Sequence, residues 1–257
     1  MSVQMMRIRI RPGHIGVLVT LVGTVCLALA CVVVARYRYL ERAELRLMPA
    51  RSDMYLAENA ALPPPVGERV VFFGDSRING WVPRPQSAGK ELVWRGVDGE
   101  TTVRMVDRFQ QDVIALQPNA VVIQAGINDL VAGCALGIGD RSAATLVQNL
   151  RQMANMAVTA SVDVYLLTIL KPSAAPLWRQ PVWSSSIYTL VDSTNMRIRG
   201  LAGKGVTVIE ADSRLSGDAS KMPGSLARDT LHLNESGYAM LNALIEDSLG
   251  VRASAVQ

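Results

Sequence analysis

Short apolar runs alternate along this sequence with longer segments of helical period, and this alternation is what most restricts the fold. Five runs rich in β-favouring residues predict strands at 70–73, 92–94, 120–124, 162–169 and 206–210. Apolar residues at helical spacing predict helices at 102–116, at 142–160 with Ser142 as its N-cap, and at 236–249, and the segment 196–202 closes a further, less regular helix. Because strands that alternate with helices usually pair in parallel, the pattern predicts an α/β fold, a parallel sheet with helices on both faces.

An uncharged apolar run of 21 residues, 15–35, precedes these elements. About 20 apolar residues let a helix span a bilayer. Arginines flank the run on both sides: Arg7, Arg9, Arg11, Arg36 and Arg38. We therefore expect one uncleaved transmembrane helix. The alternative is a signal sequence that is cleaved after Ala30 or lipidated at Cys31, but four more apolar residues follow Cys31, which makes the run long for a signal peptide.

The net charge of +4 is unevenly distributed. Residues 1–51 hold eight Arg and two Glu, whereas the rest of the chain holds 18 basic and 20 acidic residues. The basic excess therefore belongs to the membrane flank, and the composition excludes a basic domain that binds nucleic acid. A short N-terminus before one span favours translocation of a large C-terminal domain, so we expect that domain outside the cytoplasm, in the periplasm.

The domain organisation follows from these features and from Pro63-Pro64-Pro65, which ends any helix that continues from the span. The predicted parts are a basic tail (1–14), the transmembrane helix (15–35), a juxtamembrane linker (36–67), one domain (68–250) and a C-terminal tail (251–257). Only Cys134 lies in the domain, so no disulfide can form within it. The sequence offers no set of Cys and His ligands, and we expect no metal and no cofactor.

Two polar segments of the domain have the composition of a catalytic site. Gly74-Asp75-Ser76 follows the first strand, at the carboxyl edge of the sheet where α/β proteins bind ligands. Alone, this segment is more typical of a turn with a helix N-cap. His232 is the only histidine of the domain, and Asp229 is close enough in sequence to fix its tautomer. Together with Ser76, they have the composition of a Ser-His-Asp triad.

Acyl transfer also needs hydrogen-bond donors for the oxyanion that develops in the transition state. The segment 94–101 leaves the second strand with two glycines, and Gly99 can turn its N–H toward the crevice because it has no Cβ. The segment 125–129 leaves the third strand and brings the Asn128 amide to the same edge. Either segment by itself is more typical of an ordinary turn, and it is their joint placement that favours an oxyanion site.

The four blocks occur in the order found in SGNH (GDSL-type) hydrolases, and the chain resembles that family over about residues 68–250: Gly74-Asp75-Ser76, the Gly99 turn, Gly126-x-Asn128-Asp129 and Asp229-x-x-His232. The resemblance implies a flavodoxin-like three-layer α/β/α sandwich with a five-stranded parallel sheet. It also implies that Ser76 is the nucleophile, His232 the base and Asp229 its orienting group. The Ser76 N–H, the Gly99 N–H and the Asn128 side chain would form the oxyanion hole.

Two features leave the substrate open. Arg77 stands where the family commonly has leucine, and it either offers a positive charge to an anionic or sugar-linked substrate or is a solvated side chain beyond the site. The loop 171–183, which carries Trp178 and Trp183, either presents aromatic surface to a sugar or acyl chain or packs against the domain.

The resulting hypothesis is a serine esterase that removes acyl groups, such as acetyl, from a cell-envelope glycan or cleaves a lipid ester through an acyl-Ser76 intermediate. Its expected partners are that ester and the membrane, which residues 15–35 would enter. One alternative keeps the triad but transfers the acyl group to a hydroxyl of an envelope polysaccharide. Another is a non-catalytic module that binds the envelope on the same fold.

Overall fold

The computed structural model describes residues 12–50 and 52–250; residues 1–11 of the predicted basic tail and the predicted C-terminal tail lie outside them. The domain is built on a five-stranded parallel sheet in the order β2-β1-β3-β4-β5, the flavodoxin-like order. The strands are β1 (Arg69–Gly74), β2 (Glu91–Gly96), β3 (Ala120–Gln124), β4 (Asp163–Leu167) and β5 (Val206–Ile209). Each predicted strand is confirmed to within two residues at either end.

The first strand illustrates why these apolar runs form a buried sheet. Successive side chains of a strand point to opposite faces, so Val71 and Phe73 enter one apolar cluster while Val70 and Phe72 enter the other. All four side chains are at most 2% exposed. A strand that is covered on both faces has no position for a polar residue, which explains the unbroken apolar run.

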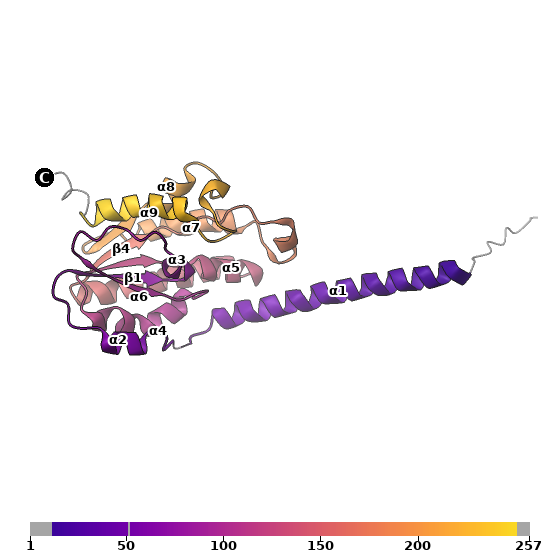
Figure 1. Ribbon diagram of the computed structural model, residues 1–257, viewed down its shortest axis with the longest axis horizontal. Coiled ribbons are helices and arrows are strands. Elements are labelled where there is room, and N and C mark those ends of the chain that lie inside the picture. Colours follow the sequence, from indigo (N-terminus) through magenta and orange to yellow (C-terminus); the bar gives the residue numbers. More distant parts are fainter. Residues whose placement is uncertain (1–11, 51, 251–257) are drawn as a thin grey trace, which may run out of the picture.

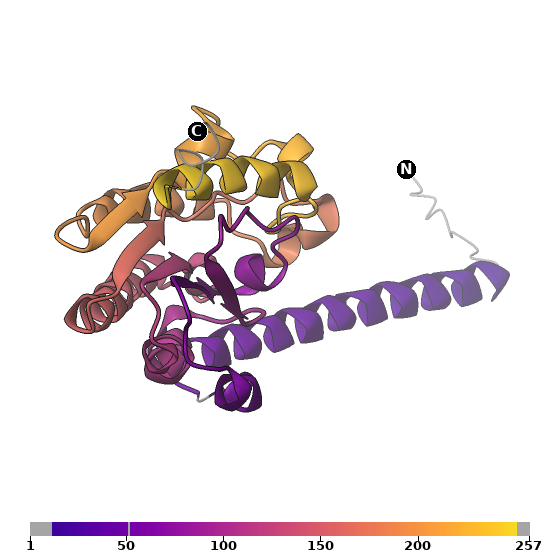
Figure 2. The ribbon, with the colours of Figure 1, turned by 60° about the vertical axis from the view of Figure 1, so that its left-hand side comes forward.

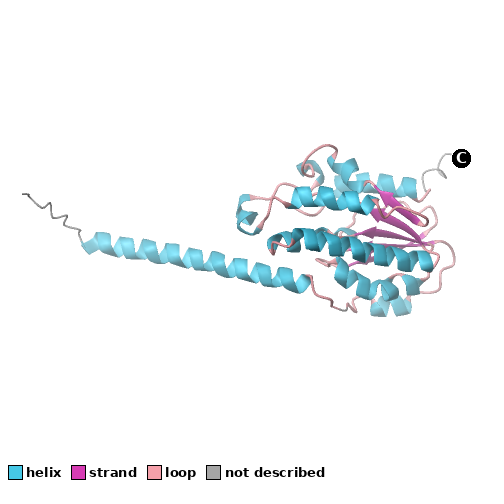
Figure 3. Cartoon of the chain, turned by 180° about the vertical axis from the view of Figure 1, so that it is seen from behind, coloured by secondary structure: helices cyan, strands magenta, loops and turns pink. Residues whose placement is uncertain are grey.

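Helices form the outer two layers of the domain. Figure 1 shows α8 (Ala211–Ser216) and α9 (Glu235–Ser248) on one side of the sheet, and α4 (Thr102–Asp112) and α6 (Gly139–Thr159) on the other. The face of α4 and α6 is also covered by α5 (Ile127–Ala135) and α7 (Ile187–Arg199). In the view from behind, helices lie in front of the strands of the sheet (Figure 3). The α/β/α prediction is thus confirmed.

The helix boundaries correct the sequence prediction at Ser142. Helix α6 begins at Gly139, so Ser142 is not its N-cap but a buried residue within its first turns. Ser142 packs against α5: a Cβ added to Gly133 would lie 2.4 Å from its hydroxyl. Helix α7, Ile187–Arg199, ends within the segment 196–202 that is predicted to close a helix.

The predicted span lies within one long helix, α1 (Pro12–Arg46), which continues into the predicted linker. The linker also contains a short helix, α2 (Leu56–Ala61), just before the triple proline. The part Gly16–Arg46 is long and apolar enough to cross a membrane, and its most apolar window is fully exposed. A signal sequence has the same properties, so membrane anchoring stays a prediction. Figure 2 shows that most of α1 projects away from the domain. Its last turns contact the domain at α5 and at the 3₁₀ segment η2 (Leu177–Val182).

Candidate active site

The turn Gly74-Asp75-Ser76 carries the predicted nucleophile, and we call it the nucleophile turn; it forms because β1 ends on a glycine. A Cβ added at Gly74 would lie 2.0 Å from the carbonyl oxygen of Gln124, so only glycine fits between β1 and β3 at this point. Asp75 then caps the short helix α3 (Ser76–Asn79), since its carboxylate accepts a hydrogen bond of 2.9 Å from the Arg77 N–H. The capping interpretation and the nucleophile interpretation are therefore compatible: Asp75 is the cap, and Ser76 is the first residue of the helix.

Ser76, His232 and Asp229 lie in a hydrogen-bonded row. His232 Nε2 lies 2.9 Å from the Ser76 hydroxyl, and His232 Nδ1 lies 2.8 Å from Asp229 Oδ2. A carboxylate only accepts hydrogen bonds, so the proton of the neutral imidazole sits on Nδ1, and Nε2 is left to accept from the Ser76 O–H. This arrangement lets His232 act as a general base toward Ser76.

The loop before α9 favours the ionised form of Asp229. Burial alone would raise the pKa of Asp229, but the backbone N–H groups of Leu231 and His232, together with the His232 ring, lower it below its usual value. The Oδ1 atom of Asp229 accepts from those two N–H groups at 2.8 and 2.9 Å. The short loop thus fixes both the carboxylate and the imidazole.

The predicted oxyanion donors lie on the same side of the sheet. Gly99 adopts a φ of +70°, a conformation that favours glycine. The amide of Asn128 donates to the carbonyl oxygen of Glu100 at 3.0 Å and makes a longer contact of 3.5 Å with Asp75 Oδ2. Ser76, Gly99, Asn128 and His232 all line one pocket of about 480 Å³. The structure therefore brings all the predicted site residues together: four of them line the pocket, and Asp229 bonds the His232 ring from outside it.

The structure contradicts both interpretations of Arg77 that the sequence allowed. Its side chain is buried, so it neither faces a substrate nor lies in solvent. Its Nε donates to the carbonyl oxygen of Leu231 at 2.8 Å, and its Nη1 donates to that of Leu170 at 3.1 Å. Arg77 therefore ties the nucleophile turn to the loop that carries His232, a role that a leucine cannot fill.

Another buried arginine, which sequence reasoning missed, supports the strand ends next to the predicted oxyanion donors. Arg108 on α4 pairs with Glu100 at 2.5 Å and with Asp112 at 2.9 Å. It also donates to the carbonyl oxygens of Gly74 and Arg95 at 3.1 Å, at the ends of β1 and β2. Arg108 and Asp112 are spaced i,i+4 on the buried face of α4, beside the apolar Met105 and Phe109, and this spacing is the signal that could have revealed the network.

The loop that follows Gly99 is held by a buried carboxylate on α5. Asp129 accepts from the Thr102 N–H at 3.0 Å and from its hydroxyl at 2.6 Å. Burial raises the pKa of Asp129 to about 7, even though the hydrogen bonds from Thr102 oppose this shift. The folded protein therefore keeps a proton on Asp129 at pH values where the unfolded chain has lost it.

This raised pKa predicts a pH-dependent loss of stability relative to an Asp129→Asn variant. Between about pH 4 and pH 7 the unfolded state binds up to one proton fewer at this residue than the folded state does. As the pH rises through this range, the free energy of unfolding of the wild type therefore falls by up to about 1.4 kcal/mol per pH unit relative to the variant. Below pH 4 and above pH 7 the difference between the two proteins is constant. Denaturant unfolding of both proteins across this range measures the difference, and parallel stability curves would contradict the assignment.

The two tryptophans of the loop 171–183 fit different interpretations of this loop: one is exposed beside the site and the other packs against the domain. Trp178 is 79% exposed and lines a pocket of about 510 Å³ that adjoins the first one and shares His232, Arg179 and Arg228 with it. Trp183 lies elsewhere, half-buried beside the end of α1 and under the guanidinium of Arg179. Only Trp178 is therefore placed to meet a substrate.

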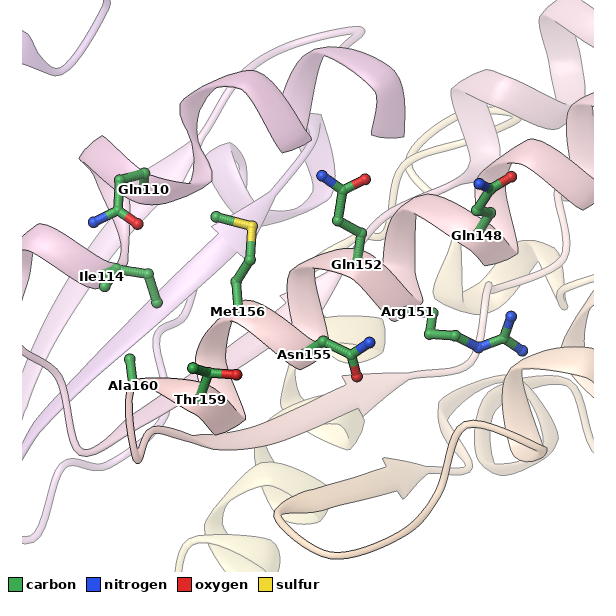
Figure 4. A pocket seen from close by; sticks show the side chains of 9 residues that line it. All are labelled: Gln110, Ile114, Gln148, Arg151, Gln152, Asn155, Met156, Thr159 and Ala160. Atoms are coloured by element: carbon green, nitrogen blue, oxygen red, sulfur yellow. The ribbon is translucent and has the colours of Figure 1, made fainter.

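A wider hollow of about 630 Å³ lies on the outer surface between α4 and α6 (Figure 4). Its lining includes Gln110, Ile114, Gln152 and Met156. None of the site residues borders it, and its lining holds no Ser, Cys, His, Asp or Glu, so its volume does not mark it as the reaction centre. Within residues 12–50 and 52–250, no group of three or more His, Cys, Asp or Glu side chains is arranged to hold a metal ion.

Comparisons with known proteins agree with this geometry. A sequence profile of the GDSL-like lipase/acylhydrolase family matches residues 67–240, a range that contains Ser76, Asp229 and His232. A GDSL-like lipase from Bacteroides thetaiotaomicron is similar in structure, with 30% identity, a TM-score of 0.64, and coverage of 76% of this chain and 95% of that chain.

An acetylxylan esterase from Geobacillus stearothermophilus shares the fold at 18% identity and a TM-score of 0.57, over 74% of this chain and 97% of that one. No curated protein matches the sequence. The family profile spans more than half of the chain and includes every predicted site residue. The chain belongs to the GDSL-like lipase/acylhydrolase family.

Proposed function

We propose that this protein is a serine ester hydrolase. Ser76 attacks the carbonyl carbon of an ester while His232 takes its proton, and His232 then protonates the departing alcohol. Water, deprotonated by His232, breaks the acyl-Ser76 bond and releases the acid. The observation that carries the proposal is the unbroken row from the Ser76 hydroxyl through His232 to Asp229, with contacts of 2.9 and 2.8 Å.

The hydrogen-bond donors around Ser76 are suited to stabilise the negative charge that develops on the ester oxygen during this reaction. In the proposal, the Ser76 N–H, the Gly99 N–H and the Asn128 amide stabilise the oxyanion of the tetrahedral intermediate. Asn128 has two amide hydrogens: the 3.0 Å bond to the Glu100 carbonyl uses one and sets the plane of the group, and the other makes the longer contact of 3.5 Å with Asp75 Oδ2, which it would exchange for the oxyanion. Asp229 stays ionised and stabilises the imidazolium.

We further propose that the substrate is an acylated, for example acetylated, glycan of the cell envelope or a lipid ester, reached from a membrane anchor. The exposed apolar length of α1 supports a single span, and the short segment that precedes the span favours a domain in the periplasm. The exposed Trp178 beside His232 supports a sugar or an acyl chain, because an indole ring offers a broad apolar face.

The test uses the full-length chain in a non-ionic detergent. A fluorophosphonate probe should label Ser76, as located by peptide mass, and the same preparation should release p-nitrophenol from p-nitrophenyl acetate. Unlabelled Ser76 and absent turnover would sink the proposal and favour a binding module. Product analysis in the presence of a polysaccharide acceptor separates hydrolysis from transfer, since only a transferase forms more acylated acceptor than free acid.

A further inference from the structure

The end of α1 is part of the wall of the proposed active site. Ala43, one turn before the end, is only 5% exposed because it packs against the domain. The Thr101 hydroxyl donates to the carbonyl oxygen of Arg46 at 2.5 Å, and Arg104 donates to the carbonyl oxygens of Leu45 and, at 3.2 Å, Met48. These bonds fix the last turn of α1 beside the Gly99 turn.

The side chain of Arg46 lies against Gly99 in this arrangement. A Cβ added to Gly99 would be 3.4 Å from Arg46 Nη2 and 3.6 Å from its Cζ. Arg46 also lines the same pocket as Ser76 and His232. A residue from the predicted linker, outside the domain in sequence, thus places a positive charge next to the proposed oxyanion donor.

Two further arginines line this pocket, and they come from separate loops. Arg179 belongs to η2 and lies over the Trp183 ring, while Arg228 precedes Asp229, with 3.8 Å between its Nε and Asp229 Oδ2. Neither Arg46 nor Arg179 has a carboxylate partner among the residues that the structure describes. The one acidic residue in the pocket lining is Asp98, whose carboxylate accepts from Asn79 at 2.9 Å.

The pocket therefore carries more positive than negative charge at the place where an ester would bind. Guanidinium groups bind carboxylate and phosphate well because their planar N–H fork matches two oxygens at once. Resting on the proposed esterase function, we propose that the site selects esters whose alcohol or acyl part carries a carboxylate or a phosphate, and that Arg46 is a specificity-determining residue for that anion.

The experiment compares esters that share one reaction and differ in charge. The full-length chain in a zwitterionic detergent hydrolyses methyl 4-acetoxybenzoate, which is neutral, 4-acetoxybenzoate, and 4-acetoxyphenyl phosphate. The readout is the ratio of kcat/KM for each anionic ester to that for the neutral ester. In Arg46→Gln this ratio should fall by about 10-fold, mainly through KM, whereas Arg46→Lys should retain most of it. The better of the two anions identifies the group that the site prefers.

Arg42 provides the matched control, since it is exposed one turn earlier on α1 and does not line the pocket. Arg42→Gln should leave the ratio unchanged, and added salt should lower the ratio in the wild type. The proposal is overturned if both variants change the ratio equally, or if Arg46→Gln slows all esters by the same factor.

Calorimetric binding of phenyl phosphate separates the two proposals. If no ester is hydrolysed but binding weakens in Arg46→Gln alone, the esterase function fails and the anion site stands. If the wild type binds this anion no better than Arg46→Gln does, the anion site fails.

Discussion

Replacing Ser76 with alanine is expected to lower kcat for p-nitrophenyl acetate hydrolysis by on the order of 10⁴- to 10⁶-fold, the range found when a triad nucleophile is removed. Alanine has no oxygen to form the acyl-enzyme, while the pocket, the N–H groups and Asn128 remain in place. KM should therefore change little. Initial rates at saturating substrate measure the loss.

Two controls keep this result interpretable. Ser248→Ala, at the far end of α9, removes a serine hydroxyl that only bonds the Leu244 carbonyl, and it should retain full activity. The double variant Ser76→Ala/His232→Ala should be no slower than Ser76→Ala within a few-fold, because residues of one triad act as a unit. Losses that multiply would show that His232 acts independently of Ser76, contrary to their 2.9 Å contact.

The sheet and the site could be predicted because both follow local rules. Each strand is an apolar run that ends at a turn, and the carboxyl ends of parallel strands meet at one edge, so the order of the four motif blocks already places Ser76 and Asn128 together. Asp229 and His232 are three residues apart, and their contact of 2.8 Å needs only one tight turn.

The remaining features could not be predicted because they depend on contacts between segments that are distant in sequence. Arg77 is buried because its partners are the carbonyl oxygens of Leu170 and Leu231, more than 90 residues away. Ser142 packs against α5 rather than capping α6, because the two helices approach closely at Gly133. Arg46 reaches the pocket only because α1 docks on the domain, which no pattern within α1 indicates.

The second large effect is on stability, and it concerns the buried network of Arg108, Glu100 and Asp112. Arg108 is 1% exposed, and its guanidinium is surrounded by the carboxylates of Glu100 and Asp112 and by two strand-end carbonyl groups. We expect Arg108→Met to lower the free energy of unfolding by about 3–5 kcal/mol, since removing one partner leaves buried charges without compensation. Burial already raises the pKa of Glu100 in the presence of Arg108. Denaturant unfolding at pH 7 measures the loss.

The control for this variant is Arg141→Met, at an exposed position near the start of α6, which should change stability by less than about 0.5 kcal/mol. If the lost stability comes from uncompensated charge, then Arg108→Met/Glu100→Gln/Asp112→Asn should be more stable than Arg108→Met alone, because its buried groups are neutral. A triple variant that is less stable would instead assign the role of Arg108 to its bonds with the Gly74 and Arg95 carbonyls. In that case the nucleophile turn, which begins at Gly74, should lose its geometry, and esterase activity should fall together with stability.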